Sequence, residues 1–239
     1  MTAAPPRVVR HDDGAPVMTA LRPKYVTFDC YGTLTWFQPG ETAARLMADR
    51  VTAERMPAFL TDFMWYRYDE VLGAWQPYVD VLKNALERTC RKHGVAFREA
   101  DGQAIYDAVP TWGPHPDVPA PLTRVGQRYP LVILSNASDD QIQRNVDLLQ
   151  APFHRVYTAQ QAQAYKPRMR AFEYMFDMLG CAPEEVLHVS SSLRYDLIPA
   201  HALRIGQRLY VNRGYEVSVP SFGYHETTTI EGLAQLLGC

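Results

Sequence analysis

The sequence predicts an α/β protein in which a doubly wound parallel sheet is interrupted by an inserted helical cap. Two observations lead to this fold class. Short apolar runs alternate with segments of helical spacing, and strands separated by helices form parallel sheets with right-handed crossovers. One long interval, from Gly40 to Val109, lacks a convincing strand and has the pattern of helices. The predicted strands are 24–30, 130–135, 154–158, 185–190 and 207–211.

The first predicted strand ends abruptly in a carboxylate. Asp29 follows the apolar residues of this strand directly, and a turn that contains Gly32 comes next. In open α/β sheets, ligands bind in the crevice at the carboxyl ends of the strands. Asp29 is therefore the first candidate for a reacting group.

The interval after this strand is predicted to form the helical cap. Its segments 41–52, 58–73 and 79–93 have helical spacing and are rich in Ala, Leu, Arg and Glu. An insertion after the first strand is the simplest arrangement that accommodates them. The chain then divides into a flexible leader at 1–22, a core made of 23–39 and 110–239, and a cap at 40–109.

Composition and charge narrow the functional classes. The chain has 239 residues, of which 47% are hydrophobic, and this suffices for a substantial core. A formal net charge of -2 without a basic run argues against nucleic acid as the main partner. No segment approaches the roughly 20 apolar residues that cross a bilayer, so no membrane association is expected. The four cysteines lie far apart without metal-type spacing, which predicts reduced thiols in a cytoplasmic protein.

Four short motifs follow one another along the chain. They are the turn from Asp29 to Leu34, Leu134-Ser135-Asn136 at a strand end, Tyr165-Lys166-Pro167, and the segment from Ser190 to Asp196. In this order they resemble the motifs of the haloacid dehalogenase superfamily, in particular of its (S)-2-haloacid dehalogenases, and the likeness spans roughly residues 24–213. The resemblance implies a Rossmann-like hydrolase core with a helical cap, an aspartate nucleophile, no cofactor and a possible homodimer.

Two departures from the phosphatases of this superfamily favour dehalogenation. The phosphatases place an acid two residues beyond the nucleophile to protonate a leaving alkoxide, whereas this chain has Tyr31 there. Halide is a weak base that leaves without a proton. In the fourth motif Ser191 stands where the first of two acids would help to bind magnesium, so no metal is expected. The alternative for Tyr31 is an aromatic side chain that only packs beside the turn.

Lys166 is predicted to take over part of the metal's role. An ammonium within hydrogen-bond range of Asp29 and Asp196 would keep both carboxylates ionised, because a nearby opposite charge lowers a carboxylate pKa. Structural alternatives remain open for both residues. Lys166 could belong to a surface Lys-Pro pair, and Asp196, three residues before Pro199, could be a helix N-cap.

Ser135 and Asn136 are candidate substrate-binding residues at the second strand end. They precede a predicted helix, so their polar groups could hold a substrate carboxylate at the positive end of that helix. Asn136 could also turn toward the departing halide. The alternative is a simple strand-to-helix turn with Ser138 as the cap.

The resemblance also implies that the cap supplies an arginine for the halide. Arg67 lies among aromatic residues that could form a dry pocket, where a guanidinium stabilises developing charge more strongly than in water. Tyr195 is expected near the substrate, where these dehalogenases often have a tryptophan. The competing cap arginines are Arg45, Arg50 and Arg55.

Some positions depart from the pattern of the (S)-2-haloacid dehalogenases. Phe172 stands six residues after Lys166, where these enzymes usually have a tyrosine near the substrate. Ser192 or Leu193 falls where they tend to have an asparagine. The histidines, among them His188, form neither a metal spacing nor a catalytic triad, so no role is predicted for them.

The predicted reaction is a two-step nucleophilic substitution. Asp29 attacks the halogen-bearing carbon of a short 2-haloalkanoic acid, expels halide and becomes an ester. Water oriented by Asp196, with Lys166 nearby, then attacks the ester carbonyl and releases a 2-hydroxy acid. Backbone N–H groups just after Asp29, helped by Thr33, would hold the oxyanion. Two other functions stay open, a magnesium-dependent phosphatase of small metabolites and a non-catalytic binding protein.

Overall fold

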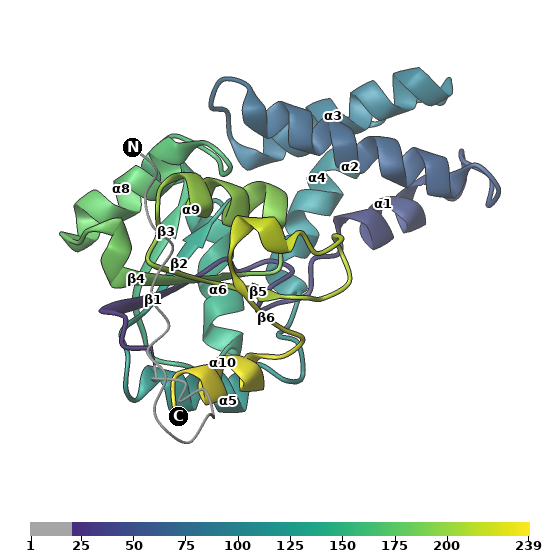
Figure 1. Ribbon diagram of the computed structural model, residues 1–239. Helices are drawn as coiled ribbons and strands as arrows, with labels where there is room; N and C mark the ends of the chain where they lie inside the picture. The colour runs from purple at the N-terminus through teal and green to yellow at the C-terminus, as the bar shows by residue number, and fades with distance from the viewer. Residues whose placement is uncertain (1–20) are drawn as a thin grey trace.

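A computed structural model describes residues 21–239 of the chain, and its centre is a six-stranded sheet (Figure 1). All neighbouring strands pair in parallel, in the order β3-β2-β1-β4-β5-β6. The predicted parallel α/β fold is therefore confirmed. The strands are β1 (Tyr25–Phe28), β2 (Leu131–Ser135), β3 (Phe153–Thr158), β4 (Val186–Ser190), β5 (Gln207–Val211) and β6 (His225–Thr227).

The first five strands match the sequence prediction to within two residues at each end. The sixth strand was not predicted. It has three residues, His-Glu-Thr, and none of them is fully buried. Because β6 is a short polar strand at the edge of the sheet, it lacks the apolar run by which the other five strands can be recognised.

Helices cover both faces of the sheet (Figure 1). Successive residues of a strand point to opposite faces. In β2, Leu131 and Ile133 pack on one side, whereas Val132 and Leu134 pack on the other. The first side is covered by α5 (Pro119–Gly126), α6 (Asp139–Leu148) and α10 (Ile230–Leu236), and the second by α8 (Met169–Leu179) and α9 (Ile198–Ala202).

Five α-helices lie between β1 and β2, and the first four of them share a hydrophobic cluster. These four lie together at one side of the sheet, in the upper right of Figure 1. Residues from all four helices contribute to this cluster, including Met47, Phe63, Leu82 and Ile105. The separate cluster supports the proposed cap at 40–109. The helices are α1 (Pro39–Met47), α2 (Met56–Leu72), α3 (Tyr78–His93) and α4 (Glu99–Ala108).

The first cap helix is shorter than the predicted segment 41–52. It ends at Met47, and the Arg50 backbone N–H donates to the Met47 carbonyl in a tight turn at 2.9 Å. The Arg50 guanidinium donates to the Leu46 carbonyl at 3.0 Å and pairs with Asp101 of α4. Arg50 thus donates hydrogen bonds to the carbonyls that the end of α1 leaves unpaired, and its ion pair connects this end to α4.

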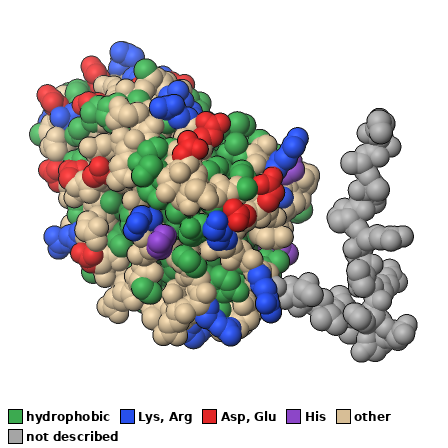
Figure 2. Space-filling model, turned by 90° about the vertical axis from the view of Figure 1, so that its left-hand side faces the viewer, with side chains coloured by type: hydrophobic (Ala, Val, Ile, Leu, Met, Phe, Trp, Pro, Cys, Tyr) green, Lys and Arg blue, Asp and Glu red, His purple; other side chains and the backbone are tan. Residues whose placement is uncertain are grey.

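The predicted leader at 1–22 lies outside the described residues except for its last two positions. In the described part of the chain, no helix is long and apolar enough to cross a bilayer. Figure 2 shows one face of the molecule, on which acidic and basic side chains are interspersed. This face carries no large area of a single charge.

Candidate active site

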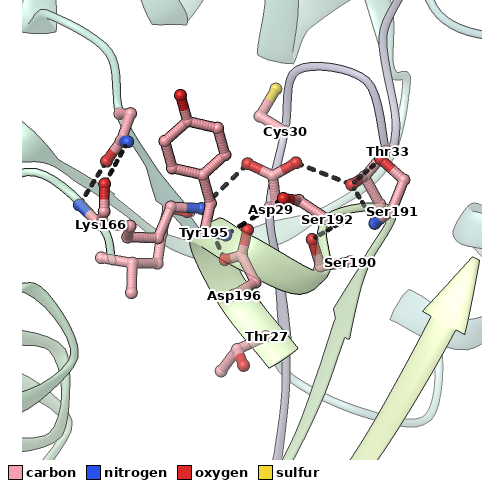
Figure 3. Close-up of polar contacts among 12 residues, drawn as sticks. Thr27, Asp29, Cys30, Thr33, Lys166, Ser190, Ser191, Ser192, Tyr195 and Asp196 are labelled. Atoms are coloured by element: carbon pink, nitrogen blue, oxygen red, sulfur yellow. Dashed lines mark hydrogen bonds and ion pairs between the residues drawn. The ribbon is translucent and has the colours of Figure 1, made fainter. Parts of the chain in front are cut away.

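A buried cluster of charges lies at the carboxyl ends of the central strands (Figure 3). The Lys166 side chain is only 1% exposed, and its ammonium donates to Asp29 Oδ1 at 2.9 Å and to Asp196 Oδ1 at 2.8 Å. A third bond reaches the carbonyl of Leu134, at the end of β2, at 2.8 Å. All three ammonium hydrogens are therefore used. The structure brings together the three groups that the sequence singled out, and Lys166 does not belong to a surface pair.

The sheet topology explains why Asp29 lies at this point. β1 pairs with β2 on one side and with β4 on the other, and ligands bind where the strand order of such a sheet reverses. The turn after Asp29 then requires Gly32, whose φ is +90°. A Cβ at this position would lie 3.4 Å from Ser191 Oγ, so glycine also allows the turn to approach the fourth motif closely.

Thr33 connects the first and fourth motifs. Its hydroxyl donates to Asp29 Oδ2 at 2.7 Å and accepts from the Ser191 backbone N–H at 2.8 Å. Asp29 is thus held from two sides, by Lys166 on one oxygen and by Thr33 on the other (Figure 3). The Ser191 hydroxyl lies 3.1 Å from that of Thr33 and lines the cavity above the carboxylates.

The two carboxylates differ in their acidity. Burial raises the pKa of Asp29, and the neighbouring charge of Asp196 adds to this, so that Lys166 offsets only part of the shift. Burial would also raise the pKa of Asp196, but Lys166 and His188 outweigh it and lower the pKa below its ordinary value. The expectation that Lys166 keeps both groups ionised thus agrees with the pKa of Asp196 but not with that of Asp29, for which desolvation prevails.

Asp196 is not a helix N-cap. It is fully buried inside a short π-helical turn, Leu193–Leu197, and the N-cap residue of this turn is Ser192. The Ser192 hydroxyl accepts from the Tyr195 backbone N–H at 3.1 Å. The π-helical turn directs the Asp196 side chain inward to Lys166, and turns of this kind occur frequently at functional sites.

A cavity of about 240 Å³ opens above the charged cluster. Asp29, Lys166 and Asp196 lie on its wall, and much of the remaining lining is apolar or aromatic. The cavity is small beside the roughly 300–1,000 Å³ of pockets for drug-sized ligands, so it suits a small molecule. Its apolar and aromatic lining includes Phe37, Met64, Val71, Tyr78, Val109 and Tyr195.

Arg67 of α2 reaches into this cavity. Its guanidinium carbon lies 5.1 Å from the ring centroids of both Phe37 and Phe63. No carboxylate pairs with it among residues 21–239, and its Nε is buried without a hydrogen-bond partner there. The competing cap arginines make other contacts and do not line the cavity. Arg45 donates to Thr42, Arg50 pairs with Asp49 and Asp101, and Arg55 donates to the His93 carbonyl.

Ser135 and Asn136 are placed differently from the expectation. The Ser135 side chain is buried and is not part of the cavity lining, so its predicted contact with the substrate is absent from this arrangement. Asn136 does line the cavity, but its amide bridges the backbone of Lys166, accepting from the N–H at 2.7 Å and donating to the carbonyl at 2.9 Å. Ser138 begins α6 as the alternative supposed, although its side chain makes no capping bond.

Tyr31 lines the cavity and is also anchored behind it. Its hydroxyl donates at 2.9 Å to Asn145, which is fully buried and donates in turn to the carbonyls of Val109 and Trp112. Burial raises the pKa of the Tyr31 phenol, which keeps the proton on this oxygen at neutral pH. Tyr31 is therefore poorly suited to act as the acid that a phosphatase has at this position.

Two residues at the site were missed by sequence reasoning. His188 of β4 is fully buried, and its Nε2 lies 3.0 Å from Asp196 Oδ1. Glu216, which follows β5, accepts hydrogen bonds from the Ser192 hydroxyl and from the backbone N–H groups of Leu193 and Arg194. Neither residue stands in a recognisable motif. The apolar neighbours of His188 in β4 gave the one available hint, because a lone histidine in a buried strand needs polar partners.

Phe172 lies behind the charged cluster and does not line the cavity. It belongs to α8, is fully buried, and packs edge to face against the His188 ring with 5.5 Å between the centroids. A phenylalanine at this position therefore contacts a residue that itself contacts Asp196.

The side chains of the cluster do not fit a magnesium site. Magnesium prefers several oxygen ligands with net negative charge, but here the two carboxylates share the ammonium of Lys166. In the described part of the chain, no group of three or more His, Cys, Asp or Glu residues is arranged to hold a metal ion. This donor set weighs against the magnesium-dependent phosphatase.

The chain also resembles known proteins in sequence. A family model described as haloacid dehalogenase-like hydrolase matches residues 23–204. The haloacetate dehalogenase H-2 of Moraxella sp. (strain B) is 28% identical over 134 residues, which cover 55% of this chain and 59% of the relative. The (S)-2-haloacid dehalogenase of Pseudomonas sp. (strain YL) is 27% identical over 177 residues, which cover 71% of this chain and 75% of the relative.

Solved structures show the same fold. The L-2-haloacid dehalogenase from Xanthobacter autotrophicus with chloropropionic acid covalently bound superimposes with a TM-score of 0.72. The match covers 90% of this chain and 98% of that one at 20% identity.

Proposed function

The chain belongs to the haloacid dehalogenase-like hydrolase family, and we propose that it hydrolyses short 2-haloalkanoic acids to 2-hydroxy acids. One observation above all supports this proposal. Lys166 holds Asp29 and Asp196 with its ammonium, next to a small cavity lined by Arg67, whose guanidinium pairs with no carboxylate in the described part of the chain. Tyr31 stands two residues beyond this nucleophile, where an acid would protonate a leaving alkoxide, and this suits a leaving group that departs as a stable anion.

In the first step a carboxylate oxygen of Asp29 attacks the carbon that bears the halogen. The new carbon–oxygen bond forms as the carbon–halogen bond breaks, and the halide leaves with the bonding electron pair. Arg67 would receive the halide in surroundings of low polarity, where its charge acts strongly. Tyr31 and Tyr195 line the cavity and would restrict the position of the substrate.

In the second step water attacks the carbonyl of the ester on Asp29. The resulting oxyanion needs hydrogen-bond donors close to this carbonyl. The N–H of Gly32 is already bonded to the Thr35 carbonyl at 2.8 Å, which leaves the N–H groups of Cys30 and Tyr31 as candidates. Thr33 contacts Asp29 Oδ2 and would stay near the reacting oxygen throughout.

A halide-release assay tests this function. Purified protein is incubated with chloro-, bromo- and fluoroacetate and with both enantiomers of 2-chloropropionate, with and without EDTA, and with a generic aryl phosphate in parallel. We expect halide release that EDTA does not reduce, and no phosphate release. Phosphate release that EDTA abolishes would establish the phosphatase instead, and binding of the acids without any turnover would establish the binding protein.

Replacing Arg67 by Leu is expected to lower kcat for halide release by about 10²- to 10³-fold, the usual cost of removing one donor that stabilises developing charge. Steady-state kinetics with 2-chloropropionate measure this effect. Arg45→Leu is the matched control, because this exposed cap arginine lies outside the cavity and should retain normal turnover. Equal rates for the two variants would remove Arg67 from the proposed mechanism.

The pH dependence of kcat/KM should show an acid limb whose midpoint lies above 3.8, the ordinary pKa of aspartate. The reason is that burial raises the pKa of Asp29, and only the ionised form attacks. Thr33→Val removes a hydrogen bond that lowers this pKa, so it should move the limb to higher pH. Thr89→Val, which alters a buried cap threonine, should leave the limb in place. An acid limb unmoved by Thr33→Val would contradict the assignment to Asp29.

We also propose a compartment and an oligomeric state. All four cysteines are free, which supports a reducing compartment such as the cytoplasm. The homodimer is proposed from the resemblance to other dehalogenases. Cell fractionation and analytical ultracentrifugation would test these two points.

A further inference from the structure

The two oxygens of Asp196 have different surroundings. Oδ1 receives hydrogen bonds from both Lys166, at 2.8 Å, and His188, at 3.0 Å. Oδ2 is buried and has no hydrogen-bond partner among the described residues. A buried carboxylate oxygen without a partner is costly, and a bound water molecule is the usual remedy. Since Asp196 lines the cavity beside Asp29, such a water would lie near the proposed ester.

His188 is locked in one orientation by its neighbours. Its Nδ1 lies 2.8 Å from the hydroxyl of Thr27, its cross-strand partner on β1. The Phe172 ring packs edge to face against the His188 ring and restricts its rotation. Because ionised Asp196 can only accept, we assign the proton of a neutral His188 ring to Nε2, and Thr27 then donates to Nδ1. Two hydrogen bonds thus connect Thr27 to His188 and His188 to Asp196, from the sheet interior to the cavity. Figure 3 shows Thr27 and Asp196 at the two ends of this chain of contacts.

We propose that His188, oriented by Thr27, is a positioning residue for the hydrolytic half-reaction, and that it holds Asp196 Oδ1 so that Oδ2 binds and deprotonates the attacking water. Lys166 alone would leave the Asp196 carboxylate free to turn about a single hydrogen bond at Oδ1. A second donor to the same oxygen, from His188 on β4, fixes the plane of the carboxylate. This inference rests on the proposed function, since it requires an ester on Asp29.

The proton balance of this step is complete. Water transfers one proton to Asp196 Oδ2 while its oxygen adds to the ester carbonyl, and the carbonyl electron pair moves to the oxyanion. When the intermediate collapses, the bond to the 2-hydroxy acid breaks and its alkoxide takes back the proton held by Asp196. Asp29 is released as a carboxylic acid and loses its proton to solvent.

The test separates the two half-reactions. His188→Leu removes the donor at similar volume, His188→Gln keeps an N–H donor, and Thr27→Val removes only the group that orients the ring. Rapid-quench measurements record halide release in the first turnover and in the steady state, and mass spectrometry of the intact protein detects the ester. His201→Leu, on an exposed part of α9, is the matched control.

With His188→Leu we expect a rapid first release of about one halide per site, followed by steady-state turnover about 10- to 100-fold slower than in the unmodified protein. The ester should accumulate, and its mass should equal that of the protein plus the 1-carboxyalkyl group of the substrate in place of one hydrogen. KM should fall with kcat. His188→Gln should restore much of the rate. Thr27→Val should show a smaller accumulation of the same ester, and it stands in for His188→Leu if the latter does not fold.

Two results would overturn the inference. One is a normal steady-state rate in His188→Leu, or in Thr27→Val if His188→Leu does not fold. The other is an equal loss of the first-turnover and steady-state rates without ester, because general damage to the site would cause that. If the unmodified protein released no halide from any haloacid, the proposed function itself would fail, and this would be evident before any variant was compared.

Discussion

Asp29→Asn is expected to reduce halide release by at least about 10⁴-fold, the scale on which enzymes lose activity when their nucleophile is removed. The amide is nearly isosteric with the carboxylate, so Lys166 keeps its partner Asp196 and the fold should persist. Halide release with 2-chloropropionate measures the activity, and circular dichroism checks the fold. Asp147→Asn, an exposed aspartate on α6, is the matched control and should turn over normally.

Labelling with H₂¹⁸O tests whether Asp29 forms the ester. In a single turnover in H₂¹⁸O, water attacks the ester carbonyl, so the heavy oxygen should enter Asp29 and not the 2-hydroxy acid. Peptide mass spectrometry would locate the label on the peptide that contains Asp29. Label found in the product after a single turnover would mean that water attacks the substrate directly, and full activity of Asp29→Asn would refute the covalent scheme.

Lys166→Met is expected to abolish turnover and also to destabilise the fold by about 3–5 kcal/mol at neutral pH, the cost of breaking a buried ion pair. The variant leaves Asp29 and Asp196 buried next to each other without their shared cation. Chemical denaturation measures the free energy of unfolding. Lys92→Met removes an exposed lysine that pairs with Asp62 on the cap surface, and it should have little effect.

The pH dependence of this loss has a definite sign. In the unmodified protein the pKa of folded Asp196 is lowered, so the stability it contributes is present above its unfolded pKa and is lost as the pH falls. Without Lys166 the pKa of both carboxylates should exceed their unfolded values, so the variant gains stability as the pH falls. The difference between the two proteins should therefore shrink toward acid. A difference that is constant with pH would contradict the role of Lys166 as their counter-ion.

The sequence was most informative about elements whose signal is local. Five strands could be predicted because each carries apolar residues that are buried in the sheet, although the edge strand β3 is fully buried only at Tyr157 and Thr158. The polar edge strand β6 could not be predicted, since its pairing with β5 depends on the finished sheet. The length of α1 was overestimated for a similar reason. The Arg50 guanidinium donates to the Leu46 carbonyl at the end of this helix and pairs with Asp101 of α4, a contact between distant segments.

In the candidate site, too, residues with a local sequence signal were predicted, and residues whose role depends on distant contacts were not. Asp29, Lys166 and Asp196 could be found from sequence because strand ends and short motifs mark them, and the structure places all three within one hydrogen-bonded cluster. Arg67 could not be separated from three other cap arginines, since helical spacing alone does not reveal which residue meets the cavity. His188 was missed because its role depends on Asp196, which a π-helical turn brings back over β4.

By itself, the sequence determined the order of the first five strands, the place of the helical insertion, the acid at the end of β1, and the serine at 191 in place of an acid. These are properties of neighbouring residues and of their spacing. Only the tertiary structure decided that Lys166 uses all three ammonium hydrogens within the cluster and that Ser135 is buried outside the cavity lining. It also decided that Oδ2 of Asp196 has no hydrogen-bond partner among residues 21–239. The physical reason is that burial and hydrogen bonding between distant segments, which set the charge and direction of each group, exist only once the chain has folded.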